Sequence, residues 1–134
     1  MLYIIWNDRN MLGIPIIDEQ HRGIVSTINS FHYFIQEGKG LNALQPTLDI
    51  LRQYTFIHFK TEEALITAAE YPDLENHIKM HSMLAEKTNQ IAEEAVSNNE
   101  PELALVFLKD WWLSHINRED SKYSSYVKKY LKIT

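Results

Sequence analysis

Residues 44–69, LQPTLDILRQYTFIHFKTEEALITAA, carry the pattern that decides the fold. The apolar positions of this stretch, with a histidine and a glutamate among them, recur at alternating steps of four and three residues. That spacing is typical of a helix whose one face forms the seam of a bundle. Pro46 is expected in the first turn, where proline is tolerated because the first backbone N–H groups have no partner within the helix. The seam consists of Leu44, Leu48, Leu51, Thr55, His58, Glu62, Leu65 and Ala69.

Three further segments of the chain repeat this helical period. The first begins at Asp18, the expected N-cap, and stops at Gly38, because these residue types favour the start and the end of helices. The next begins at Leu74, after a break at Tyr71-Pro72. The last begins at Pro101, a residue type that suits the first turn of a helix.

The connections between these segments, near residues 38–41, 70–72 and 97–100, are all short. Short connections make consecutive helices antiparallel neighbours. The sequence therefore predicts an all-α fold, an antiparallel up-down-up-down four-helix bundle forming a single domain over residues 1–134. An extended segment is expected before the bundle, and a short C-terminal helix within residues 121–131.

The composition limits both the partners and the metal chemistry of this chain. Its 134 residues suffice for one domain, and 13 Lys and Arg against 18 Asp and Glu give a net charge of −5. Such a charge argues against nucleic acid as a partner, since phosphates attract a basic surface. The absence of cysteine excludes disulfides, thiolate zinc sites and cysteine-ligated iron–sulfur clusters. Any bound metal must therefore have nitrogen and oxygen ligands.

The amino-terminal residues Met1 to Trp6 are apolar but lack the basic region and the long apolar run of a secretory signal. No stretch of the sequence approaches the length of a transmembrane helix. We therefore expect a cytoplasmic protein without stable membrane insertion, present as a monomer or a weak oligomer.

The seams contain polar groups where a bundle core normally has aliphatic side chains. Buried imidazoles and carboxylates cost stability unless they are paired, hydrogen-bonded or bound to a metal. Five histidines in one small core would be hard to satisfy with ordinary hydrogen bonds. The groups are His21 in the first helix, His58 and Glu62 in the second, His77 and His81 in the third, and His115 in the fourth.

The spacing of these groups points to metal binding. His58 and Glu62, like His77 and His81, are four residues apart, so both side chains of each pair point to one side of their helix. Asp120 follows His115 by five residues, which places it about 140° further round a regular α-helix. Asp120 can face the same centre only if the helix widens locally, as at a π-bulge.

Antiparallel packing would bring all seven groups into one cross-section of the bundle. Seven ligands are too many for one zinc ion. Two bridging carboxylates and five terminal imidazoles suit a pair of metal ions, and this mixture of ligands suits iron.

At these residues the chain resembles the hemerythrin family, and most closely its small stand-alone bacterial members, the bacteriohemerythrins. The resemblance spans the chain from Trp6 to about Tyr123. Its matching pieces are GIPIIDEQH at residues 13–21, HFKTEE at residues 58–63, His77-x-x-x-His81, and Trp111-x-x-x-His115-Ile116-x-x-x-Asp120.

The resemblance implies a pair of irons joined by two carboxylates and a hydroxide or oxo bridge. One iron would be held by His77, His81 and His115, and the other by His21 and His58, with Glu62 and Asp120 bridging the two. Dioxygen would bind at the open position of the two-histidine iron. The implied function is reversible oxygen binding, for carriage, storage or delivery in the cell, with an oxygen-consuming enzyme as a candidate partner.

The ligand charge favours a carrier over an enzyme. Carboxylate-rich di-iron bundles use about four Glu and two His, whereas this chain offers five neutral imidazoles and two carboxylates. Fewer anionic ligands make the ferric state less favourable, so that bound oxygen can leave again. Two alternatives stay open: an enzyme that reduces peroxide or nitric oxide, and an oxygen or redox sensor that acts through a partner.

Several other residues have expected roles near this centre. His32, eleven residues after His21, lies about 16 Å further along the helix, so it is expected to be structural. Glu63 is expected on the exterior. The side chains that can line an oxygen pocket, or simply pack in the core, are Trp111, Trp112, Ile24, Val25, Phe59 and Ile116.

Overall fold

The computed structural model describes residues 2–133, apart from the side chains of Trp111, Ile116 and Asn117. Within that range every regular element is helical, which confirms the predicted all-α class. The long helices are α1 (Pro15–Gln36), α2 (Gly40–Ala68), α3 (Leu74–Ser97) and α4 (Pro101–Ser114). Shorter elements are the 3₁₀ turn η1 (Asp8–Asn10), the π-helical turn η2 (His115–Glu119), the 3₁₀ turn η3 (Asp120–Tyr123) and helix α5 (Ser124–Leu131).

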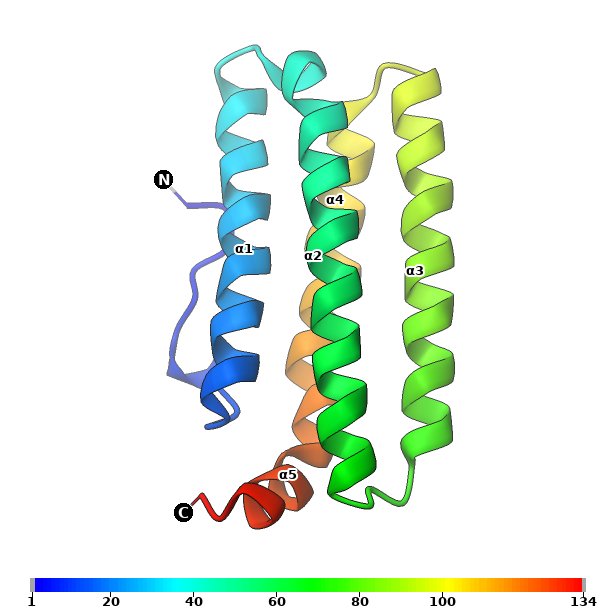
Figure 1. Ribbon diagram of the computed structural model, residues 1–134. Helices are drawn as coiled ribbons and strands as arrows, with labels where there is room; N and C mark the ends of the chain where they lie inside the picture. Colours follow the sequence, from blue (N-terminus) through cyan, green and yellow to red (C-terminus); the bar gives the residue numbers. More distant parts are fainter. Residues whose placement is uncertain (1, 134) are drawn as a thin grey trace.

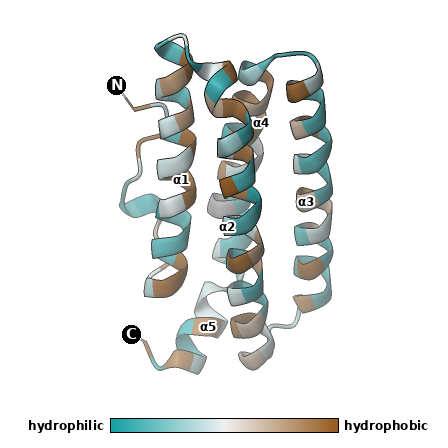
Figure 2. Ribbon diagram, turned by 45° about the horizontal axis from the view of Figure 1, so that its top comes forward, coloured by the Kyte–Doolittle hydropathy of each residue, from teal (hydrophilic) through white to brown (hydrophobic). Residues whose placement is uncertain are grey.

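Helices α1 to α4 lie side by side, and the sequence colours run alternately up and down them (Figure 1). Helix α1 packs against α2 and α4, and α3 packs against the same two helices. Helix α5 crosses the end of the bundle at which α2 and α3 are connected. Hydrophobic and hydrophilic residues alternate along each helix, as expected when only one face of a helix is buried (Figure 2).

Two hydrophobic clusters fill the interior, and the polar seam residues lie between them. The larger cluster includes Ile24, Phe59, Leu84 and Trp112. The smaller one, at the α5 end, includes Ile14, Ile17, Ile66, Tyr123 and Val127. In α1, α2 and α3 the chain passes from one cluster through the histidines to the other. The fourth pass runs from Trp112 in α4 through His115 in η2 to Tyr123 in η3. The polar layer is thereby closed off from water on both sides.

The start of α1 differs from the prediction. The helix begins at Pro15 with Ile14 as N-cap, so Asp18 lies inside the first turn and is not the N-cap. Its buried carboxylate instead accepts hydrogen bonds from the backbone N–H groups of Leu12, at 2.7 Å, and Gly13, at 3.0 Å. Asp18 therefore fastens the N-terminal segment to the helix.

Of four other expectations about helix starts and ends, one is wrong and three are confirmed. Pro46 is not in the first turn, because α2 begins six residues earlier at Gly40, and the proline lies inside the helix. The starts at Leu74 and Pro101 are confirmed. The stop at Gly38 is confirmed as well, since α1 ends at Gln36 and Gly38 has a φ of +75°, which other residues rarely adopt.

No helix in the described part of the chain has the length and apolarity required to cross a membrane.

Candidate metal centre

The seven polar seam residues meet in one layer of the bundle, where each is at most 4% exposed. Their donor atoms form two groups, and within each group they lie within 4.8 Å of one another. One group consists of Glu62, His77, His81, His115 and Asp120, and the other of His21, His58, Glu62 and Asp120. The two carboxylates belong to both groups, so this arrangement can hold two ions side by side.

Asp120 lies between the two groups of histidines. Its Oδ1 is 3.0 Å from Nε2 of His115 and 3.3 Å from Nε2 of His77. Its Oδ2 is 2.8 Å from Nε2 of His21. Each carboxylate oxygen thus faces a different group, which is the geometry required of a bridging ligand.

Glu62 contacts both groups through one oxygen. Its Oε1 lies 3.0 Å from Nε2 of His81 and 3.3 Å from Nε2 of His58. The other oxygen, Oε2, accepts a hydrogen bond of 2.6 Å from the buried hydroxyl of Tyr123. Burial, together with the neighbouring Glu62 carboxylate, raises the pKa of Tyr123 well above its usual range, so Tyr123 remains a donor.

Asp120 reaches the centre because the helix widens after His115. Residues 115–119 form a π-helical turn, and the backbone N–H of Asp120 donates to the carbonyl of His115, five residues earlier. A π-turn aligns side chains at this spacing, whereas a regular α-helix would turn Asp120 away. The predicted local widening is confirmed.

Two side chains orient the histidine rings. Nδ1 of His58 is 2.8 Å from Oε1 of Gln20, whose own amide nitrogen donates to Thr61. Nδ1 of His81 is 2.9 Å from Oε2 of Glu63. Because both partners accept, each Nδ1 carries a hydrogen and donates it, which leaves Nε2 of each ring facing the interior of the layer. A hydrogen bond of this kind is the usual support for a metal-binding histidine.

The interior atoms of the layer fit metal ions. Ligand atoms about 2.1 Å from one ion, at right angles, are roughly 3 Å apart, which matches the separations above. Lone pairs at such distances repel unless a proton or a cation lies between them. Six buried atoms that face the layer have no partner in hydrogen-bonding geometry: Glu62 Oε1, Asp120 Oδ1 and Oδ2, and Nε2 of His77, His81 and His115.

The charges in the layer balance without metal only if protons are held there. Burial lowers the pKa of His58 to about 4, so that ring is neutral. Burial also opposes charge on His77 and His115, but Asp120 and Glu62 outweigh it and raise their pKa to about 9 and about 10. Despite burial, the histidines lower the pKa of Glu62, and His115 and His21 lower that of Asp120. Two imidazolium groups therefore face two carboxylates in the metal-free protein.

The expected pocket residues lie on one side of the layer. Ile24, Val25, Phe59 and Trp112 are buried in the larger hydrophobic cluster. The Phe59 ring stacks on the His81 ring, with ring centroids 3.8 Å apart. The centroid of the Trp112 ring is 5.6 Å from that of Phe59 and 6.2 Å from that of His115. The side chains of Trp111 and Ile116 lie outside the described residues.

Two outcomes concern residues expected to be apart from the site. His32 belongs to neither group and stacks on Tyr3, with centroids 4.5 Å apart. Glu63 is not on the exterior as expected, because its side chain is only 21% exposed and accepts a hydrogen bond from His81.

Sequence reasoning also missed Gln20 and Tyr123. Gln20 adjoins His21 and Tyr123 closes the matched stretch, but spacing within one helix cannot show a contact with another.

Comparison with known proteins agrees with this geometry. A family model described as "Hemerythrin HHE cation binding domain" matches residues 12–127. The bacteriohemerythrin of Stenotrophomonas maltophilia (strain R551-3) is 30% identical over 133 residues, which cover 98% of this chain and 86% of that protein. The bacteriohemerythrin of Pseudomonas aeruginosa (strain LESB58) is 32% identical over 130 residues, 96% and 84% of the two chains. The myohemerythrin of Theromyzon tessulatum is 27% identical over 118 residues, 88% of each chain.

Proposed function

This chain belongs to the hemerythrin family, and we propose that it holds two iron ions and binds dioxygen reversibly. The observation that carries the proposal is the pair of ligand groups that share Glu62 and Asp120. In this assignment His77, His81 and His115 bind one iron and His21 and His58 bind the other. The role we propose is carriage, storage or delivery of oxygen rather than catalysis.

Two ferrous ions at this site would supply the electrons that reversible oxygen binding requires. The protein's own contribution is the low ligand charge: five neutral imidazoles and two carboxylates. Such a ligand set disfavours loss of electrons from iron more than a carboxylate-rich set does. With iron bound, this ligand set would favour release of intact oxygen over its reductive cleavage.

The surroundings keep water from the layer. All seven ligand side chains are buried, and Phe59 and Trp112 close one side of the layer with aromatic rings. A dry site limits the proton delivery that would convert bound oxygen into free peroxide. Gln20 and Glu63 hold two of the histidine rings in the tautomer that presents Nε2 to the interior.

The proposal also includes an architecture and a location. We infer an antiparallel up-down-up-down bundle in one domain over residues 1–134, supported by the alternating direction of α1 to α4 in Figure 1. We propose that the protein acts as a monomer or weak oligomer in the cytoplasm, and that it exchanges oxygen with an oxygen-consuming enzyme.

Iron reconstitution followed by an oxygen cycle tests this function. Elemental analysis is expected to give two irons per chain. The reduced protein should change its visible spectrum in air and return to the starting spectrum when oxygen is removed, without added electrons. An enzyme that reduces peroxide or nitric oxide would instead stay oxidised until a reductant is supplied. One tightly bound zinc and no iron pair would refute the proposal outright.

A further inference from the structure

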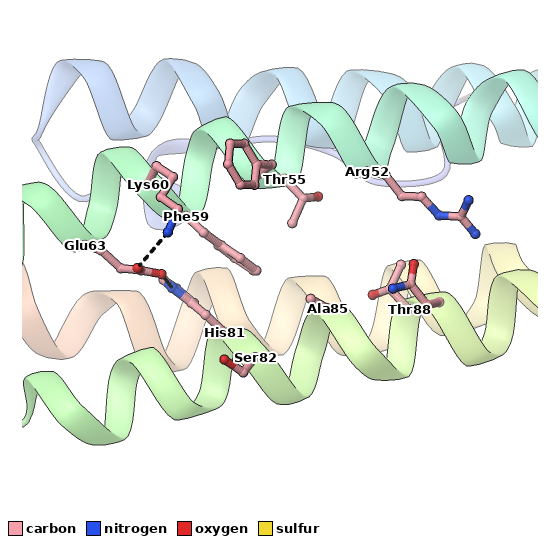
Figure 3. Close-up of a pocket in the computed structure, with 11 residues that line it drawn as sticks. Arg52, Thr55, Phe59, Lys60, Glu63, His81, Ser82, Ala85 and Thr88 are labelled. Carbon is pink, nitrogen blue, oxygen red and sulfur yellow. Dashed lines mark hydrogen bonds and ion pairs between the residues drawn. The ribbon is translucent and has the colours of Figure 1, made fainter.

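A groove between α2 and α3 opens beside the candidate metal centre (Figure 3). Its volume is about 360 Å³, which falls in the range of small-molecule sites. The groove lies between the two helices and shares Phe59, Glu63 and His81 with the surroundings of the metal centre. No ligand has been assigned to it above.

The floor of the groove is apolar and aromatic. Phe59 points from α2 toward α3, where Ala85 stands opposite it (Figure 3). The Phe59 ring is stacked against His81 at an angle of 7°. The side chain of Ala85 is a single methyl group, so it leaves space between α2 and α3. Phe59 is 7% exposed, so a flat apolar ring in that space contacts only the part of Phe59 that faces the groove.

Two cations stand at opposite ends of the groove. Arg52 and Lys60 are eight residues apart on α2, about 12 Å along the helix, and Figure 3 shows them at opposite ends. Glu63 is the one carboxylate of the lining. The groove is therefore more positive than the chain as a whole, whose net charge is −5, and it favours an anionic ligand.

The two cations differ in how they are engaged. Lys60 lies 3.9 Å from Glu63 and 5.7 Å from the Phe56 ring. Arg52 also has an ion pair of 3.9 Å, with Asp49, but both of these side chains are about half exposed, and among the described residues the structure records no aromatic ring contact for Arg52. A guanidinium can bind a carboxylate through two parallel hydrogen bonds. Arg52 is therefore the better anchor for an anion.

We propose that the α2–α3 groove binds a small aromatic carboxylate, with the ring between Phe59 and Ala85 and the carboxylate on Arg52. This inference goes beyond the proposed function, because it involves neither iron nor oxygen. The bound ring contacts Phe59, the side chain that stacks on His81. The site is thus placed to act on the metal centre from outside.

Calorimetric titration of the iron-loaded full-length protein with 1-naphthoate tests the proposal, with 1-naphthamide as the neutral ligand of the same shape. We expect 1-naphthoate to bind at one site, with affinity about tenfold higher than the amide, as a charge-assisted contact predicts. Arg52→Gln should abolish that difference and leave amide binding unchanged. Lys87→Gln, which removes an exposed cation of α3 outside the groove, is the matched control and should change neither.

Ala85→Phe locates the ligand, because the larger side chain fills the groove and should prevent binding of both compounds. Circular dichroism checks that this variant is folded, and Arg52→Gln, at an exposed position, decides the question if it is not. Equal affinity for the two compounds, an Arg52→Gln variant with wild-type selectivity, or binding that survives Ala85→Phe in a folded protein would overturn the proposal.

Discussion

The hydrogen bond from Tyr123 to Glu62 gives a measurable test of how the polar layer is stabilised. Tyr123→Phe removes one oxygen atom and leaves the ring in place. Both partners are fully buried and only 2.6 Å apart, so no water can replace the lost donor. A buried hydrogen bond to a charged group contributes about 1.5–3 kcal/mol. We expect Tyr123→Phe to lower the free energy of unfolding by that amount.

Thermal and urea unfolding of the iron-loaded protein measure this loss. For a domain of this size, we expect the midpoint of thermal unfolding to fall by roughly 5–12 °C. Tyr130→Phe is the matched control, because Tyr130 is 51% exposed and its hydroxyl is free to bond with water. A Tyr123→Phe variant within about 0.5 kcal/mol of the wild type, the usual scatter of surface substitutions, would refute the argument that Tyr123 satisfies the second oxygen of Glu62.

Three further predictions concern the layer itself. The pKa values of His77 and His115, raised from 6.5 to about 9 and about 10, contribute stability that is complete below pH 6.5 and is lost as the pH rises through those values. Urea unfolding of the metal-free protein should therefore show stability falling between pH 6.5 and 10, and a flat profile would contradict the assignment of these protons. Elemental analysis should find less iron in His77→Ala and in His115→Ala, and the wild-type iron content in His32→Ala. The reverse result would show that the metal ligands were assigned to the wrong histidines. Trp112→Ala should cost about 3–5 kcal/mol of stability, because the ring is fully buried. If Trp112 also shields the metal centre from small anions, stopped-flow measurements on the oxidised iron-loaded variant will show faster azide binding. Unchanged kinetics in a folded variant would leave Trp112 a packing role only.

The sequence predicted the parts of this molecule that follow from helical periodicity. The seams of residues 44–69 and of the third helix place His58, Glu62, His77 and His81 by spacing alone. The distance from His115 to Asp120 even required the local widening that the structure shows. These features were predictable because the period of a helix fixes which side chains share a face.

The parts that could not be predicted depend on contacts between elements. Asp18 looked like an N-cap because aspartate favours that position, but its carboxylate binds the preceding segment and the helix starts three residues earlier. Glu63 pointed away from the seam, yet α3 lies close enough for it to meet His81. The residue pattern of one helix does not show how close a neighbouring helix lies. The contacts of Gln20 and Tyr123 with the metal ligands could therefore not be predicted either.

The enclosure of the polar layer between two hydrophobic clusters has a kinetic consequence. Because every ligand side chain is at most 4% exposed, we expect an ion held there to exchange slowly while the helices stay packed. If exchange requires part of the bundle to open, its rate will equal or fall below the rate of that opening. The rate at which bound metal exchanges with a labelled isotope would thus set a lower limit on the rate at which the bundle opens. Metal ions that bind early in folding would then stay bound for as long as the protein remains folded.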